Sequence, residues 1–196
     1  FRFLGAFSEA SGGQFGSSVA TGDFNGDGIE DLAVGEPYYD SAKSIAPGAV
    51  YVFYGGASFA GKALASDTAD ASFYGAEYGE FGSSVAAGDV NGDGVTDLVV
   101  GAFEFNNAAG AAYVFYGGTT FAGKDLSVSG VTADASFYGK EAGDYLGYSV
   151  ATGDVDGDGV TDLVVGAYLN DDAGAAAGAA YVILGKSALG DIDFSA

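Results

Sequence analysis

The sequence contains no cysteine and no histidine, only two prolines, and only six lysine and arginine residues among 196. Without cysteine and histidine, the chain cannot use a thiol nucleophile or a histidine base, and it cannot build a disulfide framework, a zinc finger or an iron–sulfur site. The few basic residues stand against 27 aspartates and glutamates, which gives a net charge of −21. Nucleic acid and anionic lipid would be repelled, and we expect neither as a partner.

Long hydrophobic runs are also absent. No apolar stretch approaches the roughly 20 residues that a membrane helix needs, and no basic segment followed by an apolar one stands at the N-terminus. We therefore expect no insertion into a membrane, and a secretion signal is not visible. The chain should nevertheless fold as one domain, because 48% of its residues are hydrophobic and 14% are aromatic, far more than a disordered acidic tail contains.

Glycine, phenylalanine and tyrosine are the abundant residues that bear on the fold. The chain has 35 glycines, 15 phenylalanines and 13 tyrosines. Glycine at this frequency, without a collagen period, indicates many tight turns, and the aromatic residues favour short strands between them. The composition predicts an all-β protein.

Three copies of one sequence unit make up the chain. The segment GDFNGDGIEDLAVGEP begins at Gly22, GDVNGDGVTDLVVGAF at Gly88 and GDVDGDGVTDLVVGAY at Gly153, so the copies lie 66 and 65 residues apart. Similarity this close implies recent duplication or deliberate construction of one structural unit. Within a single domain that covers residues 1–196, we place a lead-in at residues 1–14 and repeats at residues 15–80, 81–145 and 146–196.

Each repeat has the pattern of four short strands. In the first repeat, apolar and β-branched runs predict strands at residues 17–21, 31–35, 49–54 and about 72–74, and clusters of Gly, Asn and Asp supply the turns. The alanine-rich stretch at residues 173–180 contains two glycines and aligns with loops in the other repeats, so we expect a loop there. Repeated four-stranded sheets predict the blades of a β-propeller, with three blades per chain.

Three blades are too few to close a ring, because propellers typically hold four to eight. The third repeat also stops where its fourth strand should begin, and residues 1–5, FRFLG, could supply a closing strand. We therefore expect a homo-oligomer, most simply a two-fold dimer with six blades, in which each N-terminal strand completes the partner's last blade. A fragment of a longer propeller is the alternative. In either case the single protomer would expose sheet faces and edges that recruit a partner.

Three acidic loops carry the candidate chemistry. Each repeat has the pattern Asp-x-Asn/Asp-x-Asp-Gly-x-x-Asp between its first two predicted strands, with oxygen-bearing side chains at positions 1, 3, 5 and 9 and glycine at the sharp turn. A main-chain carbonyl at position 7 can complete the shell, and the flexible oxygen shell of calcium fits better than the strict octahedron of magnesium. We expect three calcium ions per chain. The predicted ligands are Asp23, Asn25, Asp27, Ile29 and Asp31; Asp89, Asn91, Asp93, Val95 and Asp97; and Asp154, Asp156, Asp158, Val160 and Asp162.

Two other interpretations of the loops exist. Asp, Asn and Gly form good turns without a metal, but three copies in register, each with every ligand position oxygenated, favour the metal. An EF-hand needs a glutamate at position 12, whereas this chain has Val34, Val100 and Val165 there, so we reject the EF-hand. We expect a mainly structural role for calcium, since the bound ion would pin the hairpin and relieve repulsion that otherwise raises the carboxyl pKa values.

The segment FGSSVAAGDVNGDGVTDLVVGAF resembles an FG-GAP repeat, the blade unit of integrin α-subunit propellers and of many bacterial extracellular proteins. The residues that carry the resemblance are Phe81 and Gly82 before the acidic loop, and Gly101 and Ala102 after it. Nearly the whole chain shares the resemblance, although the third repeat has Leu146 in place of the phenylalanine. The resemblance implies a propeller with calcium in the hairpin loops between the first two strands of each blade, at an extracellular or cell-surface location.

We predict a non-enzymatic, calcium-stabilised propeller that acts as an extracellular interaction or scaffold module with a protein or glycan ligand. The alternative is a carbohydrate-binding lectin, because fungal lectins that look like integrin propellers exist and aromatic residues near amides or carboxylates follow the second strand of each repeat. These candidates are Tyr38, Tyr39 and Asp40; Phe103, Phe105 and Asn106; and Tyr168, Asn170 and Asp171. Ordinary packing between blades is the interpretation of these aromatics that we favour.

An enzyme is the least favoured class. The acid pairs Glu77 with Glu80 and Glu141 with Asp144 could in principle do general acid–base work, as in glycosidases, but they lie in turn-rich segments where a solvated loop is the simpler interpretation. Ser17 has no histidine to activate it. We therefore expect no enzymatic activity and no catalytic residues.

Overall fold

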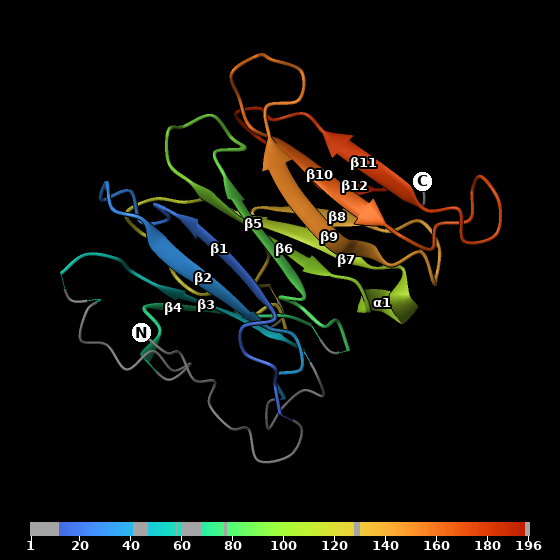
Figure 1. Cartoon of the computed structure of the whole chain (residues 1–196), viewed down its shortest axis with the longest axis horizontal. Helices are drawn as coiled ribbons and strands as arrows, with labels where there is room; N and C mark the ends of the chain where they lie inside the picture. Colours follow the sequence, from blue (N-terminus) through green and yellow to red (C-terminus); the bar gives the residue numbers. More distant parts are fainter. Residues whose placement is uncertain are drawn as a thin grey trace.

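The chain forms three β-sheets, one for each repeat, which lie side by side (Figure 1). The computed structural model describes residues 12–40, 47–57, 59, 68–76, 78–127 and 130–194. The first sheet is antiparallel and has the order β1-β2-β3-β4. Its strands are β1 (Ser18–Gly22), β2 (Asp31–Glu36), β3 (Ala49–Phe53) and β4 (Ala71–Tyr74). Each bound lies within one residue of the predicted one, and the all-β prediction is confirmed.

The second and third sheets repeat this antiparallel arrangement. The second contains β5 (Ser84–Gly88), β6 (Asp97–Ala102), β7 (Ala111–Phe115) and β8 (Ala135–Tyr138). The third contains β9 (Leu146–Gly153), β10 (Asp162–Ala167) and β11 (Ala179–Ile183), in the order β11-β10-β9. In the described residues the third sheet thus has three strands, and the predicted closing strand at residues 1–5 lies outside the described residues.

A short strand of the third repeat, β12 (Ile192–Asp193), pairs in parallel with β8 at the outer edge of the second sheet. The second repeat makes the same connection one sheet earlier, where Asp125 forms a parallel bridge with Tyr74 of β4. There, the Tyr74 N–H donates to the carbonyl of Lys124 at 2.8 Å. Each of these repeats therefore fastens itself to the sheet of the preceding repeat by main-chain hydrogen bonds. The sequence pattern did not predict this connection.

The hydrophobic core lies between the sheets. Side chains alternate along a strand, so the Leu-Val-Val run of β6 places Leu98 and Val100 in the cluster shared with the first sheet and Val99 in the cluster shared with the third. All three are fully buried, because the second sheet is covered on both faces. The same burial on both faces explains why this strand has a continuous apolar run instead of an alternating pattern.

One helical turn, α1 (Phe105–Ala108), stands among the strands of the described residues. Its residues Asn106, Asn107 and Ala108 have φ angles of 53°, 57° and 62°, so it is a left-handed turn and not a regular α-helix. The alanine-rich stretch forms no element until β11 begins at Ala179, which largely confirms the predicted loop. In the described part of the chain, no helix is long and apolar enough to span a lipid bilayer.

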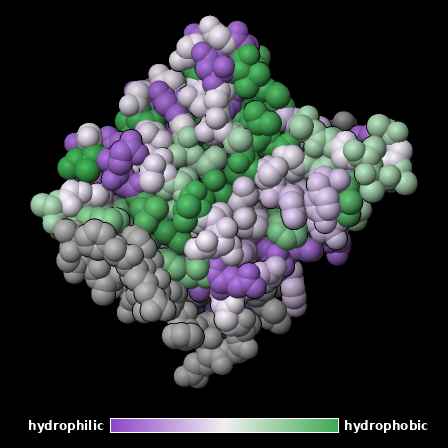
Figure 2. All heavy atoms as spheres, in the orientation of Figure 1, coloured by the Kyte–Doolittle hydropathy of each residue, from purple (hydrophilic) through white to green (hydrophobic). Residues whose placement is uncertain are grey.

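Hydrophobic residues form a band across the face on which β1, β5 and β9 lie nearest the viewer, and hydrophilic residues gather in the loops at its ends (Figure 2). Large hydrophobic side chains are also exposed on the first and third sheets. Val19 of β1 is 62% exposed, and Val182 of β11 is 50% exposed. The two outermost sheets therefore leave apolar surface open to solvent.

Glu36, at the end of β2, is a buried carboxyl in the place where the other repeats carry Ala102 and Ala167. Its side chain is 1% exposed, and in the described part of the chain its Oε2 atom has no hydrogen-bond partner. Burial raises the pKa of Glu36, and a hydrogen bond with the side chain of Tyr51 only partly offsets this. The carboxylate form of Glu36 is therefore a cost to the fold at neutral pH.

Replacing Glu36 with glutamine should stabilise the fold at neutral pH. Because the folded pKa lies above the unfolded one, the contribution of this carboxyl to stability is fully present below the unfolded pKa and is lost as the pH rises through the folded pKa. We expect Glu36→Gln to raise the unfolding free energy at pH 7 by about 1 kcal/mol, the low end of the cost of an unsatisfied buried group. Urea unfolding in saturating calcium measures it, with the exposed Glu141→Gln as control. A variant less stable than the parent at pH 7 would contradict the argument.

Candidate metal centres

The three acidic loops occupy the same place in each sheet. Residues 23–30 join β1 to β2, residues 89–96 join β5 to β6, and residues 154–161 join β9 to β10. We call them the first, second and third loops; the third is the orange loop at the top of Figure 1. In each sheet the glycine before the loop pairs with the aspartate that follows it, as Gly22 does with Asp31. The predicted position, between the first two strands of a sheet, is confirmed.

In each loop, the backbone curls around the side chain of the aspartate at position 1. In the second loop, Asp89 Oδ1 accepts hydrogen bonds from the N–H groups of Gly92 (2.7 Å) and Asp93 (3.0 Å), and Oδ2 accepts one from Gly94 (2.8 Å). Asp23 and Asp154 bind positions 5 and 6 of their own loops in the same way. The first ligand position therefore faces the interior of its loop in all three repeats.

Positions 3 and 5 continue this pattern. Asn91 Oδ1 accepts from the Asp93 N–H at 2.8 Å, and Asp93 Oδ1 accepts from the Val95 N–H at 2.9 Å. The first and third loops make the equivalent contacts. The glycine at position 6 has φ angles of 85°, 88° and 90° in the three loops, so it occupies the left-handed region that the sharp turn requires. A side chain there would be strained.

Position 9 begins the second strand and ties the loop to the third strand of the sheet. Asp97 Oδ2 accepts from the Val90 N–H, and Oδ1 accepts from the N–H of Gly117 after β7, each at 2.9 Å. Asp31 and Asp162 make the same two contacts in their own sheets. The sequence predicted these aspartates as ligands but not this second role, which becomes visible only when the third strand is in place.

The electrostatic surroundings of the three position-9 aspartates differ. Burial raises the pKa of Asp97 to about 6, against the opposing effect of its backbone donors. Burial likewise raises the pKa of Asp31. The pKa of Asp162 is lowered instead, because the N–H groups of Gly185 and Val155 outweigh its desolvation. The third loop thus has the least covered surroundings, and the side chains at its positions 1, 3 and 5 are all exposed.

The donor set fits a hard divalent cation. In the third loop, one carboxylate oxygen each of Asp154, Asp156 and Asp162 lies within 4.8 Å of the others. Asp158 is not in this group, although its N–H binds the side chains of Asp154 and Asp156. In the first and second loops the middle position is an asparagine, whose amide oxygen is an equally suitable calcium ligand. The position-7 carbonyls of Ile29, Val95 and Val160 stay predicted ligands.

Each of the first two loops is also hydrogen-bonded to the following repeat. The carbonyl of Asp23 accepts from the Thr96 N–H at 3.3 Å, and the carbonyl of Phe24 accepts from the Gly118 N–H at 2.9 Å. The second loop receives the same pair of bonds from Thr161 (3.3 Å, to Asp89) and Lys186 (3.1 Å, to Val90). The loops therefore connect neighbouring sheets as well as neighbouring strands.

The aromatic residues considered for carbohydrate binding mostly pack inside the fold. The ring of Tyr39 lies 6.4 Å from that of Tyr51 and 5.4 Å from that of Tyr74. Phe105 contacts the equivalent tyrosines of β7 and β8 at 6.3 and 5.9 Å. Asn170 is buried and donates to Asp144 Oδ2 at 3.0 Å. Tyr39 and Phe105 are therefore used for packing, although these ring contacts lie within their own repeats and not between blades, where we expected them.

Tyr168 is the exception among these candidates. It is 46% exposed, and its ring lies 4.3 Å from that of Tyr148. Phe103, from the second repeat, lies 5.3 Å from the same Tyr148 ring. Of the acid pairs considered for catalysis, Asp144 accepts from the Glu141 N–H at 3.2 Å. Glu80 is partly buried, which raises its pKa, and Glu77 lies outside the described residues.

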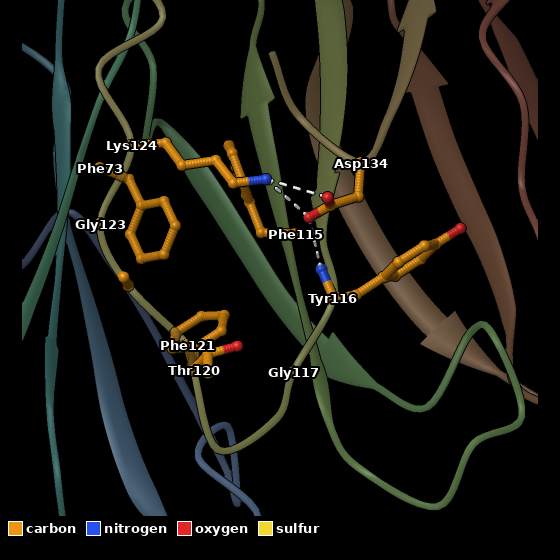
Figure 3. Close-up of a pocket in the computed structure, with 10 residues that line it drawn as sticks. Phe73, Phe115, Tyr116, Gly117, Thr120, Phe121, Gly123, Lys124 and Asp134 are labelled. Carbon is orange, nitrogen blue, oxygen red and sulfur yellow. Dashed lines mark hydrogen bonds and ion pairs between the residues drawn. The ribbon is translucent and has the colours of Figure 1, made fainter. Parts of the chain in front are cut away.

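A hollow of about 370 Å³ opens between the first and second sheets (Figure 3). Phe73, Phe115 and Phe121 line its apolar side, and Lys124 and Asp134 form an ion pair across its polar side, with Nζ 2.9 Å from both carboxylate oxygens. Asp134 also accepts from the Tyr116 N–H at 3.0 Å. The two charged groups of this hollow thus pair with each other, and the acidic loops remain the stronger candidate site.

Comparison with known proteins matches each of the three sheets to the same family. The family described as FG-GAP repeat matches residues 15–53, 81–115 and 146–183, and each match contains one acidic loop. Integrin alpha-4 of Xenopus laevis is 30% identical over 170 residues, or 83% of this chain, and integrin alpha-3 of Mus musculus is 42% identical over 109 residues, or 54%. Phosphatidylinositol-glycan-specific phospholipase D of Bos taurus is 34% identical over 162 residues, or 78%. The chain spans only 15%, 10% and 18% of the lengths of these relatives.

Proposed function

The chain belongs to the FG-GAP repeat family, and on that premise we propose that it is a calcium-binding β-propeller module for extracellular interaction, with calcium in a mainly structural role. One observation carries the proposal. All three loops carry oxygen-bearing side chains at positions 1, 3, 5 and 9, and in each loop the position-1 carboxylate accepts from the N–H groups of positions 5 and 6, although the loops lie in different sheets and differ in burial. Three turns without a common ligand would have no need to keep oxygen-bearing side chains at the same four positions.

The residues of this chain would hold calcium as follows. Positions 1, 3 and 5 supply side-chain oxygens already aimed inward by the loop, position 7 supplies a carbonyl, and position 9 supplies a carboxylate anchored to the third strand. Bound calcium supplies the positive charge that lets these carboxylates stay close without protonation. Three ions would offset 6 of the 21 excess negative charges.

The structural role follows from the bonds between repeats. Because the first and second loops accept hydrogen bonds from the next sheet, a loop that is ordered by calcium also orders the boundary between two sheets. Calcium would then stabilise the arrangement of sheets as a set. We propose that these three sheets are propeller blades, and that two chains form a six-bladed ring.

The extracellular location and the absence of enzymatic activity are part of the same proposal. Integrin alpha subunits predominate among the named relatives, and calcium loops with this chemistry fill where the ion is at about millimolar concentration, as outside the cell. One relative is named as a phospholipase D, but the chain spans only 18% of its length. In one of the two candidate acid pairs, Asp144 is engaged in a turn, where it accepts from the Glu141 N–H, which supports a binding module over an enzyme. We propose a protein as the partner of this module.

Carbohydrate binding is the alternative that we keep, on one surface. The rings of Tyr148 and Tyr168 are both about half exposed and lie together at the end of the third sheet, where a sugar ring could stack. A glycan screen of the chain against its Tyr168→Ser variant tests this alternative.

Calcium titration by calorimetry tests the proposal directly. We expect one ion to bind per loop, and each of Asp23→Ala, Asp89→Ala and Asp154→Ala to reduce the stoichiometry by one ion, because each removes the side chain around which its loop is wrapped. Asp171→Asn, on an exposed turn outside the loops, is the charge-matched control and should bind as the parent does. If all three variants bound calcium as the parent does, the loops would not be the sites.

A further inference from the structure

In the first and second loops, one residue packs into the following repeat. Phe24, at position 2 of the first loop, is fully buried, and its ring stacks on that of Phe121 from the second repeat at 5.6 Å. Val90 holds the same position in the second loop, is also fully buried, and packs in one cluster with Leu189 of the third repeat. We call this position-2 side chain the plug.

The plug of the third loop has nothing to fill. Val155 is 60% exposed, and in the described part of the chain no N–H donates to its carbonyl or to that of Asp154. The same difference runs along β11, where Val182 is 50% exposed whereas Val52 and Val114, its equivalents in the other sheets, are fully buried. In the first and second sheets, the equivalent face is covered by the following repeat. In the third sheet this face is exposed.

Among the described residues, a second hollow lies at the opposite end of the molecule. It measures about 410 Å³ and sits on the first sheet. Its lining consists of Thr21, Glu30, Asp31, Leu32, Gly55, Gly56 and Phe59. By repeat alignment, Gly56 and Phe59 correspond to Gly118 and Phe121, the residues that receive Phe24 in the second repeat. We call this hollow the socket: it is the first repeat's copy of a site that is filled in the second and third repeats.

We propose that a second copy of this chain docks head to tail, with Val155 of one copy in the socket of the other. The N–H groups of Glu30 and Gly56 stand where Thr96 and Gly118 stand in the second repeat, so they can donate to the carbonyls of Asp154 and Val155. Repeated twice, this heterologous contact closes a ring of six sheets, as such contacts do when their rotation closes. The inference rests on the proposed blade arrangement and adds the surfaces and residues through which the ring closes.

Charge opposes this contact and defines the conditions under which it forms. The chain carries a net charge of −21, and Glu30 stands where the other repeats have an uncharged threonine. Its carboxylate would approach the third loop of the second copy, in which all the ligand side chains are acidic. Calcium in that loop and moderate salt both reduce the repulsion, so docking should strengthen with either.

Light scattering of the 196-residue chain in calcium tests the proposal. We expect a mass of about twice 19.4 kDa that falls to the monomer value on dilution. A monomer with filled calcium loops would overturn the proposal, and the faces would then be covered by something other than a second copy. A dimer that binds no calcium would overturn the proposed calcium-binding role instead, so the two failures are distinguishable.

Two variants outside the loops make the test specific to the proposed face. At Gly166 the one close neighbour of an added methyl group would be the Ser149 hydroxyl, which can rotate away, whereas at the equivalent Gly101 the methyl group would press on the carbonyl oxygen of Gly147 in the next repeat. Gly166→Ala should therefore leave the protomer folded but block docking, and Val182→Glu should do the same by burying a charge. We expect each to weaken association at least 100-fold with calcium stoichiometry unchanged. Ala177→Glu, on an exposed turn, is the control. A dimer that persists in both variants would overturn the proposed interface.

Discussion

Chelating calcium with EGTA is expected to lower the melting temperature of the protein by about 20 °C, and adding calcium back is expected to restore it. An ion present at a hundred times its dissociation constant stabilises the folded state by about 2.7 kcal/mol, so three loops together contribute about 8 kcal/mol. In a domain of this size, each kcal/mol shifts the melting temperature by about 2–4 °C. Scanning calorimetry in calcium and in EGTA measures the shift.

The loops should not contribute equally to this shift. The second loop accepts hydrogen bonds from Thr161 and Lys186 of the next repeat, whereas the third loop receives no such bonds in the described residues. Asp89→Ala should therefore lower the melting temperature in calcium more than Asp154→Ala does. Asp171→Asn should leave the whole EGTA effect in place. A melting curve that EGTA does not change would mean that the loops are stable turns without an ion.

Much of the site could be predicted because its information is local. The order of Asp, Asn and Gly within nine residues determines the loop, and the structure gives the position-6 glycine the positive φ that the pattern requires. The three copies also align with one another, so an assignment for Asp89 applies to Asp23 and Asp154 as well. The bounds of the strands could be predicted for the same reason, because β-branched runs lie between glycine-rich turns in every copy.

What the sequence could not show depends on contacts between repeats. The bridge of Asp125 to Tyr74 and the pairing of β12 with β8 involve one or two residues each, too few for a hydrophobic period to appear. The burial of Glu36 depends on residues that converge on it from other segments, Gly13 and Tyr51 among them. The second role of the position-9 aspartate needs the glycine after the third strand, which lies about 20 residues away in sequence.

The same contacts between repeats account for the second large effect that we expect, at the phenylalanine that opens the second repeat. Phe81 is fully buried, its ring lies 5.8 Å from that of Tyr113, and its N–H donates to the carbonyl of Pro47 in the preceding repeat at 3.2 Å. Phe81→Ala removes a large side chain between two sheets that are fixed by main-chain bonds and cannot close the gap. We expect it to lower the unfolding free energy by about 4 kcal/mol, within the usual range for a buried phenylalanine. Urea unfolding in saturating calcium measures this loss.

Phe15, which opens the first repeat, is the matched control for this argument. Its ring contacts Tyr51 and Phe53 within its own sheet, at 5.9 and 6.4 Å, but it is only partly buried. In the Gly166→Ala background, docking of a second copy should be blocked. There we expect Phe15→Ala to lower the unfolding free energy by about 1–2 kcal/mol, which is less than the loss for a fully buried ring. In the chain that keeps Gly166, and in calcium, the loss of unfolding free energy caused by Phe15→Ala should rise toward that of Phe81→Ala. The reason is that the second copy would then cover Phe15 as the first repeat covers Phe81. Equal costs for Phe15→Ala in the two backgrounds would show that the added cover does not come from a second chain.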